Sequence, residues 1–241
     1  MPTCRRSQHG AALLLLILLM GFGAAALLMG GFQPEQVEAR RQRETLATLA
    51  QAREALLGYA LNNGRLPRPA VSATNGVEST QPCSAAAACT GFIPWVTLGL
   101  PGLDGWGKRL HYSVTAAFTE APLRQDVTVA DKRVVSRRPN GVTYFLAGYN
   151  QCNKEYQCAP AVIFSSGRHN PGVAASGMVQ ISDSNSNIDE IYNDSAVNDF
   201  IVRPASLPGD ERALGGEFDD LVIWLPLASL YQRMGVTGTL N

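Results

Sequence analysis

The chain has 241 residues, of which 46% are hydrophobic, and it carries no formal net charge at neutral pH. Proteins that bind nucleic acid usually carry an excess of basic residues, so the charge balance gives no reason to expect a nucleic-acid partner. The length suits a short N-terminal segment followed by one domain of ordinary or slightly enlarged size.

The first 32 residues have the layout of a membrane segment. Residues 1–10 contain Arg5 and Arg6 and no acidic residue, and residues 11–32 form an uncharged apolar run. A helix of that length reaches about 33 Å, enough to cross a hydrocarbon core of about 30 Å. By the positive-inside rule the two arginines stay cytoplasmic, and the rest of the chain lies outside the cytoplasm. A cleaved secretory signal peptide is the alternative, although its apolar region would be shorter.

Residues 33–64 predict an amphipathic helix that continues the membrane helix. Pro34 suits the first position of a helix, and Gly64 predicts its end. An apolar stripe at helical spacing joins the two ends; it consists of Leu46, Leu49, Ala50, Leu56, Leu57, Ala60 and Leu61. We therefore expect one rod of about 50 residues, bent at Gly30, Gly31 and Pro34.

The remaining residues, 65–241, predict a globular head. Residues 68–91 and the polar residues 168–217 are expected to be loops with little regular structure. The expected strands are residues 109–115, 126–130, 142–149, 161–165 and 221–225, followed by a short helix at residues 227–234. The predicted fold class is therefore α+β, with a long N-terminal helix, half transmembrane and half amphipathic, packed on an antiparallel sheet.

Four cysteines outside the leader form two pairs with equal spacing; they are Cys83, Cys89, Cys152 and Cys158. In an oxidising periplasm, four thiols predict two disulfides. Residues 142–149 and 161–165 are expected to pair antiparallel, which would bring Cys152 and Cys158 together at the base of their connection. The Cys83–Cys89 pair rests on the oxidising setting and the matched spacing alone. A zinc site is the alternative, but the usual spacing within a zinc pair is two to four residues.

Two acidic segments are candidate sites. Oxygen-bearing side chains alternate between Asp183 and Asp194 as in a calcium loop, but Ile188 stands where an EF-hand needs glycine, and a solvated loop is the alternative. Asp219 and Asp220 are adjacent, and neighbouring side chains on a strand point to opposite faces, so they make a poor acid/base pair. No catalytic, cofactor-binding or metal-binding residue and no enzymatic activity are therefore expected.

Four features, taken in order, resemble the type IV pilin-like family, and more narrowly the pseudopilins of type II secretion. They are a basic leader ending at Gly10, LLGYA followed by GRLP in residues 56–67, LPGLDGWGKRLHY in residues 100–112, and AVIFSSG in residues 161–167. The third is similar to the Asp-Pro-Trp-Gly-x-x-Tyr segment of pseudopilins, and the fourth resembles a strand and Ser-x-Gly turn of that fold. The resemblance covers most of residues 5–167.

The resemblance implies a pilin-like fold and a non-enzymatic subunit of a type II secretion or type IV pilus-like filament. The subunit would cross the inner membrane once, with its C-terminal domain in the periplasm. A prepilin peptidase would cleave between Gly10 and Ala11, and the new N-terminus would be methylated. The implied partners are other pilin-like subunits and inner-membrane assembly proteins.

One departure from the family pattern restricts the kind of subunit that the resemblance implies. Cleavage after Gly10 places Leu15 at the fifth mature position, where pilin-like proteins usually carry a glutamate that pairs with the amine of a neighbouring subunit. The resemblance therefore implies a minor or initiating subunit. The alternative function is a membrane-tethered periplasmic binding module or enzyme that uses the helix only as an anchor.

Overall fold

The computed structural model describes residues 13–20, 34–126, 128–180, 187–206 and 214–237. The chain divides into two compact units, Met1–Arg41 and Gln42–Asn241. In the first unit, residues 13–20 are helical and their apolar side chains are exposed. Helix α2 (Pro34–Asn63) begins in the first unit and ends in the second.

The expected long N-terminal helix, with a transmembrane half and an amphipathic half packed on the sheet, is wrong. The longest helix in the described part of the chain is α2, which has 30 residues, and no described helix combines the length and the apolar character that a membrane crossing needs. Most of the predicted membrane segment, residues 11–32, lies outside the described residues. Pro34 begins α2 because proline cannot donate an N–H to a preceding turn and disfavours a helical residue before it.

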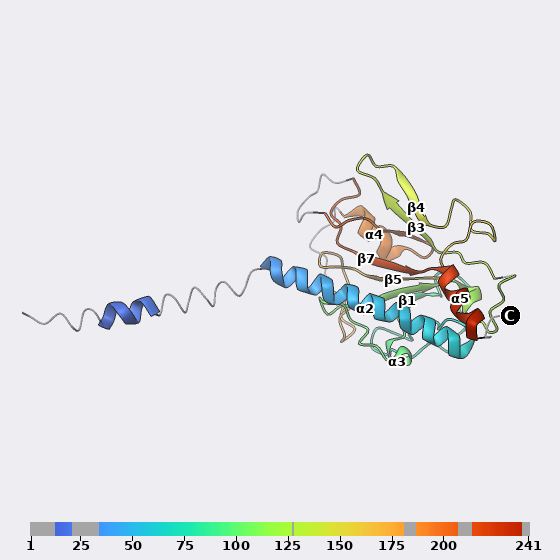
Figure 1. Ribbon diagram of the computed structural model, residues 1–241, viewed down its shortest axis with the longest axis horizontal. Helices are drawn as coiled ribbons and strands as arrows, with labels where there is room; N and C mark the ends of the chain where they lie inside the picture. Colours follow the sequence, from blue (N-terminus) through green and yellow to red (C-terminus); the bar gives the residue numbers. More distant parts are fainter. Residues whose placement is uncertain (1–12, 21–33, 127, 181–186, 207–213, 238–241) are drawn as a thin grey trace, which may run out of the picture. The chain divides into compact units, whose positions relative to one another are not determined.

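The second unit is α+β and contains two sheets (Figure 1). The four-stranded sheet is antiparallel and has the order β1 (Thr90–Phe92), β2 (His111–Val114), β5 (Ala161–Ser165), β7 (Leu221–Leu225). The three-stranded sheet has the order β4 (Thr143–Ala147), β3 (Arg133–Arg137), β6 (Asp199–Ile201). Because β3 pairs antiparallel with β4 and parallel with β6, this second sheet is mixed.

Short helices complete the second unit. They are α3 (Trp95–Leu98), the 3₁₀ turn η1 (Ala116–Thr119), α4 (Ile188–Ser195) and α5 (Leu227–Thr237). Helix α4 and strand β6 occupy the region that the sequence predicted to be loop, and β3 begins at Arg133 instead of within residues 126–130. The apolar pattern did not reveal α4, because this helix buries Asp189 and Glu190 and exposes Ile191.

The four-stranded sheet separates two hydrophobic clusters. On one face, Ile163 of β5 belongs to the main core together with Leu49 of α2 and Leu230 of α5. On the other face, Phe164 of β5 packs with Phe200 of β6 in a second cluster. Successive residues of a strand point to opposite faces, so β5 is buried along its whole length.

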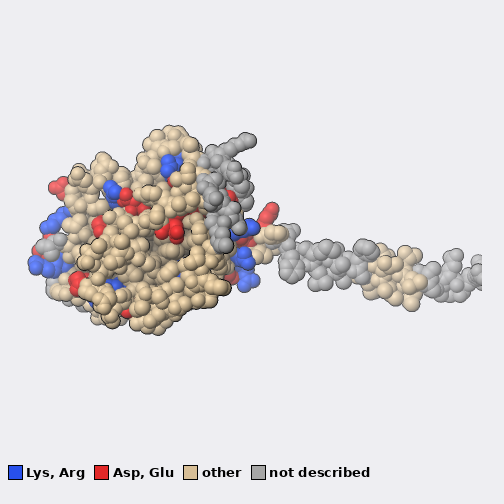
Figure 2. Space-filling model, turned by 180° about the vertical axis from the view of Figure 1, so that it is seen from behind, with Lys and Arg blue, Asp and Glu red and all other residues tan. Residues whose placement is uncertain are grey.

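Charged side chains are dispersed over the face of the molecule shown in Figure 2, where basic and acidic residues lie among larger areas of neither kind. Ion pairs among the described residues include Arg65 with Glu78 at 2.5 Å and Arg68 with Glu120 at 2.9 Å. This distribution agrees with a chain that has no net charge.

Candidate functional site

Residues 100–112 form a turn around the carboxylate of Asp104. Its Oδ1 accepts the backbone N–H groups of Trp106 at 2.9 Å and Lys108 at 2.8 Å. Its Oδ2 accepts the hydroxyl of Ser165, on β5, at 2.6 Å. The Asp104 side chain is buried, and burial raises the pKa of its carboxyl above the usual value. Asp104 therefore joins the turn to the end of β5.

The same segment is bonded to three further parts of the fold. The backbone N–H of Gly105 donates to Thr45 Oγ1 on α2 at 2.9 Å, and the hydroxyl of the fully buried Tyr112 donates to the carbonyl of Pro67 at 3.0 Å. Lys108 Nζ donates to the carbonyls of residues 167, 168 and 170. The segments that resemble pseudopilins at residues 56–67, 100–112 and 161–167 are thus joined by hydrogen bonds.

Three carboxyl groups meet between α4 and the start of β7. Glu190 lies in the first turn of α4, Asp219 and Asp220 directly precede β7, and their oxygens lie within 4.8 Å of one another. Glu190 Oε1 accepts the backbone N–H of Asp219, and Asn193 Nδ2 donates to Asp220 Oδ2 at 2.9 Å. Asp219 and Asp220 precede the strand, so the strict alternation of a strand, on which the expectation of a poor acid/base pair rested, does not apply to them; the expectation itself stays a prediction.

Burial dominates the electrostatics of this acidic cluster, which consists of Glu190, Asp219 and Asp220. Burial, followed by the charge of Asp219, raises the pKa of Glu190 to about 8. Burial also raises the pKa of Asp220 well above its usual value, and Glu190 adds to this effect. The neighbouring Asp189, by contrast, is bonded by two arginines, Arg137 at 2.8 Å and Arg203 at 2.9 Å.

A glycine allows the loop after β5 to close over the cluster. The backbone N–H groups of Arg168 and His169 donate to Asp219 Oδ2 at 2.8 and 3.3 Å. Gly167 precedes them with a φ of +58°, and a Cβ at this position would clash with the Asp219 carboxylate. The glycine that ends the AVIFSSG segment is therefore required both by its backbone conformation and by the closeness of Asp219.

Several buried oxygens around the acidic cluster have no hydrogen-bond partner in the described part of the chain; they are Asp219 Oδ1, Asp220 Oδ1, Asn187 Oδ1 and Ser166 Oγ. Asn187 Nδ2 donates to Glu190, so its amide lies against the cluster. Continuing the β5–β7 register by one residue places Ser166 opposite Asp220. Such oxygens can share a proton, or they can serve as ligands to a hard divalent cation.

Within the candidate calcium loop at residues 183–194, the described part from Ile188 onward is helix α4, so neither an EF-hand loop nor a solvated loop is present there. Residues 183–186 lie outside the described residues. The carboxyl group of Glu190 lies close to those of Asp219 and Asp220. The only feature of the sequence that pointed to this cluster was the pair of adjacent acidic residues at positions 219 and 220.

Both predicted disulfides are present; Cys83 is bonded to Cys89 and Cys152 to Cys158, with Cα atoms 5.0 and 5.5 Å apart. The structural reason given for the second pair is wrong, because β4 and β5 belong to different sheets and do not pair. A local turn closes this loop instead. Asn153 Oδ1 accepts the backbone N–H groups of Glu155 at 2.9 Å and Tyr156 at 2.7 Å.

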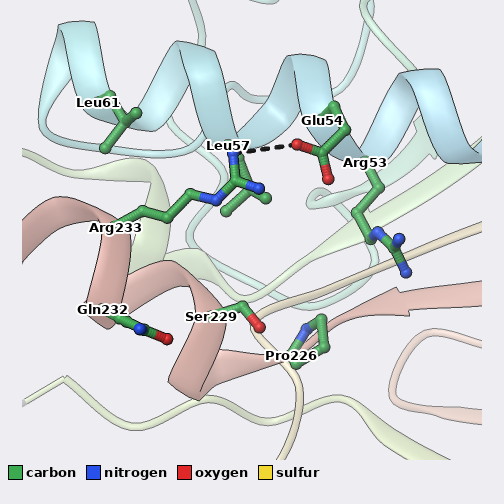
Figure 3. A pocket seen from close by; sticks show the side chains of 8 residues that line it. All are labelled: Arg53, Glu54, Leu57, Leu61, Pro226, Ser229, Gln232 and Arg233. Carbon is green, nitrogen blue, oxygen red and sulfur yellow. Dashed lines mark ion pairs between the residues drawn. The ribbon is translucent and has the colours of Figure 1, made fainter.

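A groove of about 620 Å³ lies between α2 and α5 (Figure 3). Its lining residues are Arg53, Glu54, Leu57, Leu61, Pro226, Ser229, Gln232 and Arg233. Arg233 of α5 forms an ion pair with Glu54 of α2 at 3.0 Å across the groove. The lining contains no histidine or cysteine, so it holds no nucleophile paired with a histidine base. The groove is therefore better suited to binding another surface than to catalysis.

The predicted processing site, Gly10 and Ala11, lies outside the described residues and stays a prediction. No protein-family model, curated protein or solved structure matches the chain. Arguments about function therefore depend on the residues of this chain.

Proposed function

We propose that the chain is a non-enzymatic minor subunit of a type II secretion or type IV pilus-like filament. The resemblance to pseudopilins rests on four sequence features, and one structural observation supports reading them together. Asp104 is bonded to Ser165 and Tyr112 is bonded to Pro67, so three of the four features are in direct contact. These contacts support treating the three segments as parts of one local structure.

In this proposal, the apolar run of residues 11–32 inserts in the inner membrane and the head, residues 65–241, lies in the periplasm. Two disulfides suit an oxidising compartment. The partners are other pilin-like subunits, inner-membrane assembly proteins and the prepilin peptidase that removes the leader. Leu15 at the fifth mature position makes this a minor subunit.

The alternative is a tethered periplasmic binding module or enzyme. The observation that favours it is the acidic cluster, because strongly shifted pKa values often mark functional sites. Glu190 is fully buried and Asp220 is only 4% exposed, however, so a substrate has little access to either carboxyl group. We therefore prefer the assembly subunit.

Removal of the leader separates the two functions. The full-length chain is co-expressed with a prepilin peptidase and its mass is measured. We expect loss of residues 1–10, a new N-terminus at Ala11, and no cleavage of Gly10→Val. Gly21→Val is the matched control, with the same substitution inside the apolar run, and is expected to be cleaved normally. An intact N-terminus, in cells where the peptidase processes another pilin, would overturn the proposal, as would cleavage within residues 23–26 by signal peptidase.

A further inference from the structure

Helix α2 carries a second stripe of side chains beside the one that packs into the main core. The buried stripe includes Leu49, Leu56 and Ala60. Each of these three is followed directly by a member of the second stripe, which lies about 100° further round the helix. The second stripe, at helical spacings of three and four, consists of Leu46, Ala50, Arg53, Leu57 and Leu61.

This second stripe leads into the groove between α2 and α5. Leu57 and Leu61 line the groove together with Pro226, which precedes α5, and they give it an apolar surface (Figure 3). Leu46, further along the stripe, is 46% exposed. From Leu46 to Leu61 the stripe extends about 22 Å along α2, which is the length of about four turns of a helix.

The walls of the groove favour a helix as its occupant. Both walls are helices, whose backbone N–H and C=O groups are largely bonded within each helix, so the groove offers few backbone partners to an extended strand. A helix satisfies its own backbone groups and needs only side-chain contacts. Two neighbouring helices can receive a third, with anchor side chains three, four and seven residues apart.

The charge of the groove selects the kind of helix. Glu54 and Arg233 pair with each other at 3.0 Å across the groove. Arg53 is half-buried in the lining, and no carboxylate of the described residues forms an ion pair with it. The lining thus has two arginines against one glutamate. A partner with a carboxylate beside Arg53 compensates this charge, whereas an apolar partner would bury it unpaired.

A second copy of this chain does not meet that requirement. A two-fold symmetric contact uses the same patch on both copies, so it would place one positively charged groove against another. We propose that the groove between α2 and α5 binds an acidic amphipathic helix of another protein, with apolar side chains on Leu57 and Leu61 and a carboxylate beside Arg53. This inference does not depend on the proposed filament function, because it uses only the shape and charge of the groove.

A pair of synthetic peptides tests the proposal. Each is a helix of about 16 residues with leucine at helical spacing, held by a chemical staple because short isolated helices are marginal in water. One peptide carries glutamate beside the leucines, and the other carries lysine at the same positions. Labelled peptides are titrated into the full-length chain in a non-ionic detergent, with empty micelles as the blank. We expect several-fold tighter binding of the glutamate peptide, and a smaller difference at high salt.

Substitutions in the groove show whether the peptide binds there. Arg53→Glu is expected to reverse the preference, so that the lysine peptide binds more tightly. Arg138→Glu, at an exposed position after β3, is the matched control and should leave the preference unchanged. Leu61→Ala is expected to weaken binding of both peptides several-fold, and Leu146→Ala on β4 should not. Circular dichroism checks that each variant is folded.

Three results would overturn the proposal. The first is equal affinity for the two peptides, and the second is a preference for the glutamate peptide that survives Arg53→Glu. The third comes from sedimentation of the chain alone. A dimer of the natural chain that Leu61→Ala dissociates would assign the groove to a second copy.

Discussion

At the scale of single residues, buried polar side chains connect segments that are distant in the sequence. Asp104 joins a turn to β5, and Tyr112 joins the end of the same segment to Pro67. A buried donor or acceptor left without its partner costs about 1–3 kcal/mol, which is more than an average hydrogen bond contributes. Substitutions at such positions therefore test the connections directly.

Asp104→Ala is expected to lower the free energy of unfolding by about 3 kcal/mol, because two backbone N–H groups and a serine hydroxyl lose their acceptor. Asp104→Asn keeps one side-chain oxygen and should cost less. Asp126→Ala, at an exposed position, is the control and should change stability by no more than about 0.5 kcal/mol. Urea unfolding with unchanged m-values measures these differences. Equal losses for the two alanine variants would contradict the role given to Asp104.

The acidic cluster is expected to make stability fall as pH rises. The pKa of Glu190 is about 8 in the folded protein, against an ordinary value of 4.5. The folded state therefore holds the proton more tightly, and this stabilisation is fully present below about pH 4.5 and lost as the pH approaches about 8. One pKa unit corresponds to about 1.4 kcal/mol, so the loss is at most a few kcal/mol.

Glu190→Gln tests this expectation, because glutamine keeps the shape of the side chain and does not titrate. Urea unfolding over this pH range should show a flatter profile for Glu190→Gln than for the natural chain, and no change for Glu155→Gln on an exposed loop. Identical profiles for the natural chain and Glu190→Gln would refute the assignment of this pH dependence to Glu190. If calcium chloride removes the decline and a chelator restores it, a cation has replaced the proton in the cluster.

At the scale of helices and strands, prediction succeeded where apolar residues face the main core. The run at residues 161–165 is β5 as expected, and Leu49 and Leu56 of the predicted stripe are buried on α2. Leu46 of that stripe is 46% exposed, and the neighbouring Thr45 is buried because it accepts the N–H of Gly105. Apolar periodicity cannot predict a polar side chain that is buried by a specific hydrogen bond.

Prediction failed where the buried side chains are polar, and where consecutive strands belong to different sheets. Helix α4 buries Asp189, Glu190 and Asn193, so its sequence resembles a solvated loop. Consecutive strands often pair, but residues 150–160 lead from β4 in one sheet to β5 in the other. The acidic cluster joins residue 190 to residues 219 and 220, and no local pattern predicts that contact.

Each disulfide closes a short loop, and its removal is expected to cost about 2 kcal/mol through the gain in freedom of the unfolded chain. The double variant Cys83→Ala/Cys89→Ala should cost more than Cys152→Ala/Cys158→Ala. Cys83 and Cys89 both belong to the main core, whereas in the second pair Cys158 belongs to it and Cys152 only packs against it. Thermal unfolding with and without reductant measures both losses. A larger loss for Cys152→Ala/Cys158→Ala would show that the core position of Cys83 and Cys89 does not determine the cost.

At the scale of the whole molecule, the chain combines an N-terminal apolar run with a disulfide-bonded α+β head. The expected single long helix is wrong, because the longest helix in the described part of the chain is α2, with 30 residues. Pro34 begins α2 and marks the start of the new helix. The two compact units of the chain are divided at residues 41 and 42, within this helix.

Leu15 is expected to prevent the chain from replacing a major subunit. A pilin-like subunit without a carboxylate at the fifth mature position cannot pair with the amine of its neighbour in the apolar membrane, where a lone charge costs about 2.5 to 3.5 kcal/mol. Expressed with the assembly proteins but without other subunits, the chain should form no long filaments visible by electron microscopy. Long homopolymers would contradict the minor-subunit assignment.

The most direct test of the central claim is whether the chain is part of a filament. The chain is expressed with its sister subunits, filaments are sheared from the cells and pelleted, and the pellet is analysed by quantitative mass spectrometry. The account predicts the processed chain, beginning at Ala11, in the filament fraction, in fewer copies than the major subunit, and it predicts that Gly10→Val is absent from that fraction. Recovery of the natural chain only in the membrane fraction, while filaments of the major subunit form normally, would contradict the account.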